Sequence, residues 1–76
     1  MNQSEEKLCE WQLKMTGDFF TLLINAMMRA DTTNSAKLMM GFPELMGTVH
    51  RYKNEEGYYQ KLCDEWNEKY PNHQIN

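Results

Sequence analysis

The sequence predicts an all-α fold, a single small domain of four to five short helices spanning residues 1–76. Apolar residues recur at three- and four-residue spacing along most of the chain, and no segment alternates apolar and polar residues for long enough to form a strand. The chain is 41% hydrophobic and 25% charged, which is typical of a globular domain. Its best apolar run, Leu22–Met28, is interrupted by Asn25 and falls well short of the ~20 residues that a membrane helix needs.

The first expected helix lies within residues 1–16, which we interpret as an N-terminal helical extension. Ser4 is a candidate N-cap, and Glu5 and Glu6 follow in the first turn, where the helix dipole favours acidic side chains. Gly17 then interrupts the helical pattern, and Asp18 can cap a new helix. The apolar stripe of the first helix is formed by Leu8, Trp11 and Met15.

The second expected helix, Phe19–Ala30, is the most hydrophobic segment of the chain. Thr21, Asn25 and Arg29 mark its polar face. Its predicted apolar face consists of Phe19, Leu22, Leu23, Ala26, Met27 and Ala30. A polar break at residues 31–35 ends this helix, because its members are good caps and poor helix formers.

Glycine and proline delimit the next two helices. A short helix, roughly Asn34–Met40, is expected to stop at Gly41, the residue type that most readily takes the left-handed conformation after a helix end. Pro43 is suited to the first position of a further helix, because its missing N–H costs no hydrogen bond there. The apolar face of that helix comprises Leu45, Val49 and Tyr52, with Met46 alongside.

The last helix is expected over about Glu55–Tyr70, with Asn54 as its cap. Its apolar side carries Tyr58, Tyr59, Leu62, Cys63, Trp66 and Tyr70. Its polar side carries Gln60, Lys61, Asp64, Glu65, Glu68 and Lys69. Pro71 ends the helix, and residues 71–76 are expected to form a frayed tail. Across the helices, the predicted core centres on Phe19, Leu23, Phe42, Leu62 and Trp66.

Charge and cysteine usage favour a reduced, cytoplasmic setting and disfavour nucleic-acid binding. The net charge is −3, and residues 55–76 alone sum to −3, whereas a nucleic-acid binder usually presents a basic face. Cys9 and Cys63 lie 54 positions apart without the clustered ligands of a zinc site. A disulfide between them requires the first and last helices to pack together, and we expect both to be reduced apolar residues.

No residue pattern indicates catalysis, a cofactor or a metal. His50 and His73 have no serine, cysteine or carboxylate partner at a catalytic spacing. Neighbouring carboxylates such as Glu55 and Glu56 diverge by about 100° on a helix, so they cannot act as an acid–base pair. A chain of this length also buries only about 60% of its unfolded surface, which leaves little room for a deep pocket. We therefore expect a non-enzymatic protein.

Methionine usage points to a protein-binding surface. Seven of 76 residues are methionine, and flexible thioethers either fill gaps in a small core or form an adaptable interface. Adjacent helical residues cannot share one seam, so one member of each Met-Met, Tyr58-Tyr59 and Phe19-Phe20 doublet is expected to face outward. The predicted partner-binding residues combine the methionine region with the acidic last helix: Met28, Met40, Tyr59, Glu55, Glu56, Asp64, Glu65 and Glu68.

Part of the chain resembles a group of small, functionally uncharacterised proteins of Bacteroidetes, their phages and mobile elements. The resemblance covers about residues 15–66, and residues 1–14 are an extension relative to it. Its most specific part is the string A-D-x-x-N-x-x-K-L-x-x-G-F-P-E, which starts at Ala30, followed by N-E-x-G-Y, which starts at Asn54. The resemblance implies a phage or mobile-element setting and names no activity or catalytic residue.

The leading interpretation is a phage or mobile-element protein that binds a larger host protein in the bacterial cytoplasm. A host-defence component, such as a CRISPR effector, is the first target class that we consider. The alternative is a structural or assembly role, in which the chain self-associates, as a homodimer for example, or decorates a phage particle. A transcription regulator ranks third, because the sequence has no basic recognition helix.

Overall fold

The computed structural model describes residues 1–75 and confirms an all-α domain; no strand occurs in this part of the chain. The five helices are α1 (Gln3–Gln12), α2 (Asp18–Arg29), α3 (Thr32–Gly41), α4 (Pro43–Asn54) and α5 (Tyr58–Lys69). They form a flattened molecule with extents of 38 × 28 × 18 Å. None of these helices combines the length and the apolar character that crossing a bilayer requires.

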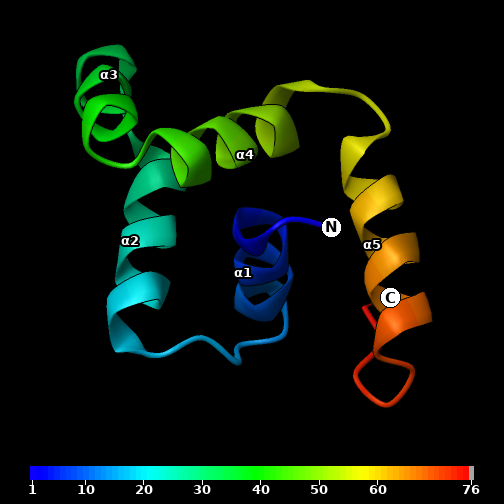
Figure 1. Ribbon diagram of the computed structural model, residues 1–76. Coiled ribbons are helices and arrows are strands. Elements are labelled where there is room, and N and C mark those ends of the chain that lie inside the picture. Colours follow the sequence, from blue (N-terminus) through cyan, green and yellow to red (C-terminus); the bar gives the residue numbers. More distant parts are fainter. Residues whose placement is uncertain (76) are drawn as a thin grey trace.

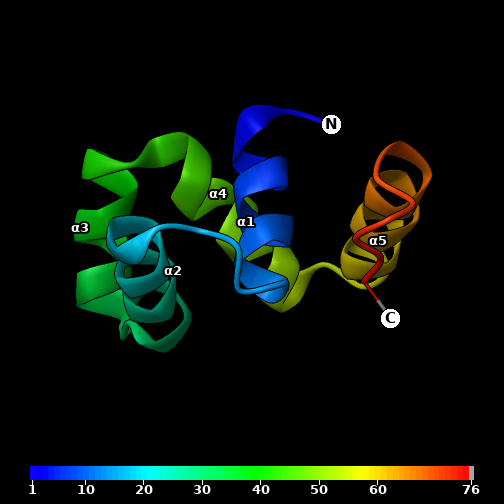
Figure 2. The same ribbon diagram turned by 90° about the horizontal axis from the view of Figure 1, so that it is seen from below.

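Helix α1 lies at the centre of the molecule, with α2 and α3 on one side, α4 across it and α5 on the other side (Figure 1). It packs against α2, α4 and α5, whereas α3 packs mainly on α4. The view from below shows the same order, with α1 and α4 between α2–α3 and α5 (Figure 2). We expected an N-terminal extension, but α1 packs against three of the other helices, and α4 packs against all four.

The ends of α1 are fixed by local hydrogen bonds. Asn2, not Ser4, is the N-cap: its side chain accepts from the Glu5 N–H, and the Glu5 carboxylate accepts from the Asn2 N–H. At the other end Lys14 takes the left-handed conformation, with φ 59°. Its N–H bonds to the Trp11 carbonyl, and the Met15 N–H bonds to the Glu10 carbonyl, the Schellman pattern. The helix ends before Met15, which is exposed.

The remaining helix boundaries differ from the sequence expectations by up to three residues. Helix α3 begins at Thr32 because the Asp31 side chain caps the Asn34 N–H at 2.8 Å. Gly41 is the last residue of α3 and does not adopt a positive φ. Pro43 occupies the start of α4, as predicted. Helix α5 starts at Tyr58 because Gly57, with φ 84°, turns the chain before it.

The core lies between α1, α4 and α5 and reaches α2 through two residues. The buried apolar side chains are Leu8, Cys9, Ile24, Met27, Leu45, Met46, Val49, Tyr58, Leu62, Cys63, Trp66 and Ile75. Leu62 and Trp66 are buried as predicted, and Leu23 packs on the edge of the core. The prediction was wrong for Phe19, which is 61% exposed, and for Phe42, which is 39% exposed. Phe19 lies on the face of α2 opposite the buried Ile24, and Phe42 lies at the junction of α3 and α4.

Residues 71–75 fold back onto α5, although we expected a frayed tail; Asn76 lies outside the described residues. The Trp66 indole N–H donates to the His73 carbonyl at 2.7 Å. The Asn67 amide accepts from the Ile75 N–H at 2.7 Å and donates to the Ile75 carbonyl at 2.9 Å. The Ile75 side chain is buried in the core. The tail therefore closes one end of the α5 interface.

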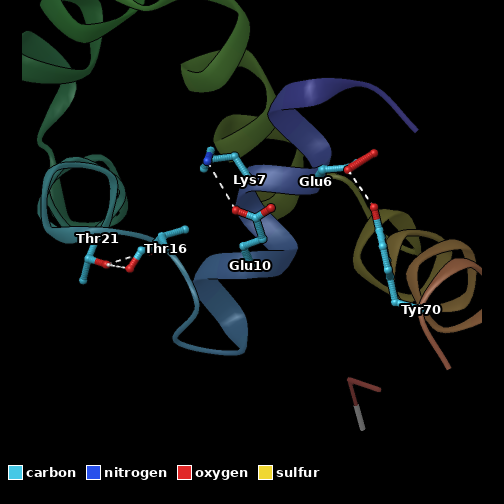
Figure 3. Close-up of polar contacts among 6 residues, drawn as sticks. All are labelled: Glu6, Lys7, Glu10, Thr16, Thr21 and Tyr70. Atoms are coloured by element: carbon cyan, nitrogen blue, oxygen red, sulfur yellow. Dashed lines mark hydrogen bonds and ion pairs between the residues drawn. The ribbon is translucent and has the colours of Figure 1, made fainter. Parts of the chain in front are cut away.

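Polar contacts seal the seam between α1 and α5. The Tyr58 hydroxyl donates to the buried Glu5 carboxylate at 2.7 Å. Glu6 accepts from the Lys69 ammonium at 2.7 Å and from the Tyr70 hydroxyl at 3.2 Å, and Figure 3 shows the second of these contacts. Figure 3 also shows the Lys7–Glu10 ion pair on α1 and the Thr16–Thr21 hydroxyl contact, which fastens the α1–α2 connection. The α1–α5 seam is thus apolar inside and hydrogen-bonded at its rim.

Candidate functional site

Exposed apolar side chains gather at the α2–α3 end of the molecule, which we call the apolar end. Within residues 1–75, seven large apolar side chains are exposed, and five of them fall between residues 19 and 42. The members of the apolar end are Phe19, Leu22, Met39, Met40 and Phe42. Exposed apolar patches occur at contact surfaces for proteins, membranes or ligands, whereas single exposed apolar residues are common and carry no such meaning.

Helix α2 has two apolar faces, and only one of them is buried. Ile24 and Met27 point into the core and are fully buried. Phe19 and Leu22 lie on the opposite side, and they are 61% and 69% exposed. A helix that is hydrophobic all round is normally buried on all sides. The outer face of α2 therefore leaves in solvent two large apolar side chains that a hydrophobic helix would normally bury.

The aromatic residues around the start of α2 show how the outer face is built. Phe20 points inward and its ring is covered by the Lys7 ammonium, 4.6 Å from the ring centroid. Phe19 meets the Phe20 ring edge-on, with centroids 5.3 Å apart. The Phe42 ring, at the α3–α4 junction, lies 6.4 Å from the Phe19 ring. The three rings thus connect the core to the exposed surface.

An open groove runs between α2 and α3 beside these rings. It encloses about 550 Å³ and is lined mainly by small or apolar residues of the two helices. Ala26 comes from α2, Ala30 directly follows α2, Leu38 and Gly41 come from α3, and Phe42 directly follows α3. The cationic residues Arg29 and Lys37, together with Asp31 and Asn34, complete the lining. A groove with this lining can accept an apolar side chain from another protein.

The two methionines predicted for the partner surface differ in position. Met40 is 85% exposed and points outward from α3. Met28 is partly buried and packs against the core. The Met39–Met40 doublet therefore contributes an outward side chain as predicted, whereas Met28 contributes to the core edge. A substitution of Met28 would therefore change core packing as well as the surface.

The acidic residues predicted for the partner surface lie on and before α5. Glu56, Asp64 and Glu68 are exposed, and Asp64 accepts a hydrogen bond from Gln60. Glu55 is held by Arg51 through two hydrogen bonds, and this contact lowers the pKa of the Glu55 carboxyl. Glu65 is half-buried. Four of these five carboxylates are exposed, and they give the α5 end a solvated acidic surface.

The predicted partner-binding residues do not form one surface. Met40 lies on α3, at one end of the molecule, and the acidic residues lie at the α5 end, with α1 and α4 between them (Figures 1 and 2). Tyr59 packs edge-on against Tyr52, with ring centroids 5.3 Å apart, and is partly buried. A partner that touches both ends must span much of the 38 Å length of the molecule.

Burial and neighbouring groups raise the pKa values of two residues near the α1–α5 interface, Cys9 and Tyr59. Burial, and then the neighbouring Cys63, raise the pKa of the Cys9 thiol to about 12. A hydrogen bond to Cys63 and partial burial raise the pKa of Tyr59 to about 12. Cys9 and Cys63 are both buried, free thiols, and the packing of α1 on α5 places them in the same core. The raised pKa of Cys9 disfavours the thiolate that a nucleophile needs.

No metal-binding cluster of three or more His, Cys, Asp or Glu residues occurs within residues 1–75. No family model, curated protein or solved structure matches this chain.

Sequence reasoning missed the exposure of Phe19, Leu22 and Phe42, because it assigned Phe19 and Phe42 to the core and Leu22 to the apolar face of its helix. A signal was present: the Phe19-Phe20 doublet requires one ring to face outward, and Phe19 is that ring. A second signal was the excess of apolar residues in Phe19–Ala30 over what one helix face can bury.

Proposed function

We propose that this chain is a non-enzymatic binding protein of a phage or mobile element, and that it acts by occupying a larger host protein in the bacterial cytoplasm. A host-defence component of the CRISPR type is the target class that we place first. The phage setting rests on the resemblance of residues 15–66, and the binding mode rests on the surface. The observation that carries the binding mode is the apolar end, where Phe19, Leu22 and Met40 are mostly solvent-exposed.

The composition of the apolar end supports a protein partner over a small molecule. Aromatic residues and methionine are enriched in protein interfaces, and thioethers adapt to varied contacts. The groove is open and bordered by exposed side chains, whereas small-molecule sites are enclosed and bury most of the ligand. The acidic face of α5, at the other end, can steer association and contributes less to affinity.

The test is an affinity capture from a Bacteroidetes host lysate, followed by mass spectrometry and a binding measurement with the purified partner. The wild-type chain is compared with Met40→Glu and with the double reversal Glu65→Lys/Glu68→Lys. We expect one dominant large host protein. Met40→Glu should weaken its binding at least about tenfold, since it places a charge in a desolvated contact. The charge reversal should slow association, mainly at low salt.

Capture of nothing beyond copies of this chain would contradict the host-protein proposal. It would favour the second candidate, a structural or assembly role through self-association. A specific observation favours that candidate as well: the outer face of α2 carries the exposed apolar side chains Phe19 and Leu22.

A further inference from the structure

We propose that the outer face of α2 binds the same face of a second copy of this chain, in an antiparallel pair with twofold symmetry. This inference rests on the part of the proposed function in which the apolar end binds protein. It assigns a second copy of this chain to one region of the apolar end. That region is the α2 stripe, which consists of Phe19, Leu22, Ala26 and Arg29. All four residues are exposed.

The order of residues in the α2 stripe is complementary to itself. Successive helical residues turn by 100°, so these four positions fall within an arc of about 80° on the helix surface. When a second helix is laid against the first in the opposite direction and centred between Leu22 and Ala26, Leu22 of each copy faces Ala26 of the other. In the same register, Phe19 of each copy faces Arg29 of the other. Each large side chain therefore meets a small or a cationic one.

Each of these contacts has a physical basis in the structure. Ala26 lines the open groove of about 550 Å³ between α2 and α3, so Leu22 of the second copy has a space to enter. Leu22 is 69% exposed in the single chain, and most of its apolar surface would leave water on pairing. The guanidinium of Arg29 would stack on the exposed Phe19 ring, as the Lys7 ammonium does on Phe20 within one chain.

Charge selects the antiparallel arrangement and a second copy as the occupant. Asp18 and Arg29 lie at opposite ends of α2 and on the same side of the α2 stripe. Neither forms an ion pair with another described residue. In an antiparallel pair Asp18 of each copy lies beside Arg29 of the other, whereas a parallel pair would bring like charges together. Twofold symmetry creates this contact twice.

The other end of the molecule is unsuited to self-association. The α5 face carries the exposed carboxylates Glu56, Asp64 and Glu68, and two copies meeting there would place like charges opposite each other. Met40 lies outside the α2 stripe, on the outer side of α3. Pairing through α2 therefore leaves Met40 and the acidic face of α5 available to a larger partner, and it presents each of them twice.

The first experiment measures the mass of the purified chain by sedimentation velocity and light scattering over a wide concentration series. We expect the wild type to approach twice its 9.1 kDa mass as concentration rises. Leu22→Asp should weaken self-association about a hundredfold or more, because it places a carboxylate in the centre of the contact. Met40→Asp is the matched control and should dimerise as the wild type does. Circular dichroism checks that both variants remain helical.

The second experiment tests the register with new cysteines. A mixture of Leu22→Cys and Ala26→Cys chains should form a disulfide-linked heterodimer, because these positions face each other in the antiparallel pair. Each variant alone should cross-link far more slowly, since equivalent residues lie beyond the distance of about 7 Å that a disulfide spans. The native Cys9 and Cys63 are buried, and the wild type is the control for their reactivity.

Three results would overturn the inference: a wild type that stays monomeric throughout the series, a Leu22→Asp variant that dimerises normally, or preferential cross-linking of Leu22→Cys with itself. The proposed function fails separately. A monomeric chain that still captures a host protein refutes only the inference, and a dimer that captures no host protein refutes only the host-protein proposal.

Discussion

Helices α2 and α5 are each twelve residues long, yet the more hydrophobic of the two is the less buried. Helix α5 buries four side chains, Tyr58, Leu62, Cys63 and Trp66, whereas α2 buries only Ile24 and Met27. The apolar side of α5 faces α1 and is closed by the C-terminal tail. The second apolar face of α2 has no helix over it. Burial in this molecule therefore follows how the helices are packed and not the hydrophobicity of each segment.

The two helices also differ in the polar atoms of their large side chains. On α5, the Tyr58 hydroxyl and the Trp66 indole N–H both find internal partners, which allows large amphipathic side chains to be buried at low cost. Phe19 and Leu22 on α2 have no polar atoms to satisfy, and their exposure leaves apolar surface in water. We conclude that the apolar side of α5 stabilises the fold, whereas the outer face of α2 is accessible to solvent.

The largest expected loss of stability comes from Trp66→Ala, which removes a buried side chain from α5. Trp66→Ala removes a side chain that is 3% exposed and its 2.7 Å hydrogen bond to the His73 carbonyl. The expected loss is about 3–5 kcal/mol of unfolding free energy, close to the whole stability of a domain of this size. Thermal and urea unfolding, followed by circular dichroism, measure it. Phe42→Ala, at the apolar end, is the control and should cost about 1 kcal/mol or less, and equal losses in the two variants would refute the comparison.

Tyr58→Phe tests the buried polar pair of the α1–α5 seam. The variant leaves the Glu5 carboxylate without its 2.7 Å donor in a buried position, and we expect a loss of about 1–3 kcal/mol at neutral pH. Tyr70→Phe removes a longer, 3.2 Å bond to Glu6, which is already paired with Lys69, and should cost less. Reversal of that order would show that the seam is held mainly at its rim.

The same pair predicts how stability depends on pH. Burial opposes ionisation of Glu5, but hydrogen bonds from Asn2 and Tyr58 and nearby positive charges outweigh it, so the pKa of Glu5 lies below 4.5 in the folded chain. Its contribution is therefore present above pH 4.5 and is lost as pH falls below that value. Burial and the Glu5 carboxylate raise the pKa of Tyr58 above 10, so a second contribution is lost as pH rises past 10. In Tyr58→Phe the alkaline loss should shrink, and an unchanged alkaline slope would contradict this assignment.

Asn67→Ala sharpens the comparison at the end of α5. The variant removes two hydrogen bonds to the Ile75 backbone, which hold the tail over the core. We expect a loss of about 1 kcal/mol in stability and a faster hydrogen exchange of the Ile75 amide. Asn67→Asp keeps the acceptor for the Ile75 N–H and should fall between the wild type and Asn67→Ala. Equal protection of the Ile75 amide in all three chains would show that the buried Ile75 side chain alone holds the tail.

The smallest expected effect on stability comes from the outer face of α2. Leu22→Ser, measured at a dilution where the chain is monomeric, should change the unfolding free energy by no more than about 0.5–1 kcal/mol, because Leu22 is 69% exposed and serine is only a slightly poorer helix former. Ile24→Ser, two residues along, places a hydroxyl in the core and should cost several times more. Similar losses at the two positions would mean that both faces of α2 are buried in solution.

The sequence alone determined the all-helical fold and the positions of most helices. The faces of α4 and α5 were predicted correctly, because each carries one apolar stripe and therefore leaves one choice of side to bury. The outward position of one residue in each of the doublets at Phe19 and Met39 also followed from helical geometry. These features depend on spacing within a few residues, which the sequence displays directly.

The tertiary structure decided which face of α2 is buried, the central place of α1 and the closure of the tail on α5. Helix α2 carries apolar residues on two sides, and its packing against α1 and α4 selects Ile24 and Met27 for burial over Phe19 and Leu22. The pairings of Glu5 with Tyr58 and of Glu6 with Lys69 join residues more than fifty positions apart. Helical periodicity is local, whereas these contacts depend on how the five helices are arranged in space, so they emerge only when the chain has folded.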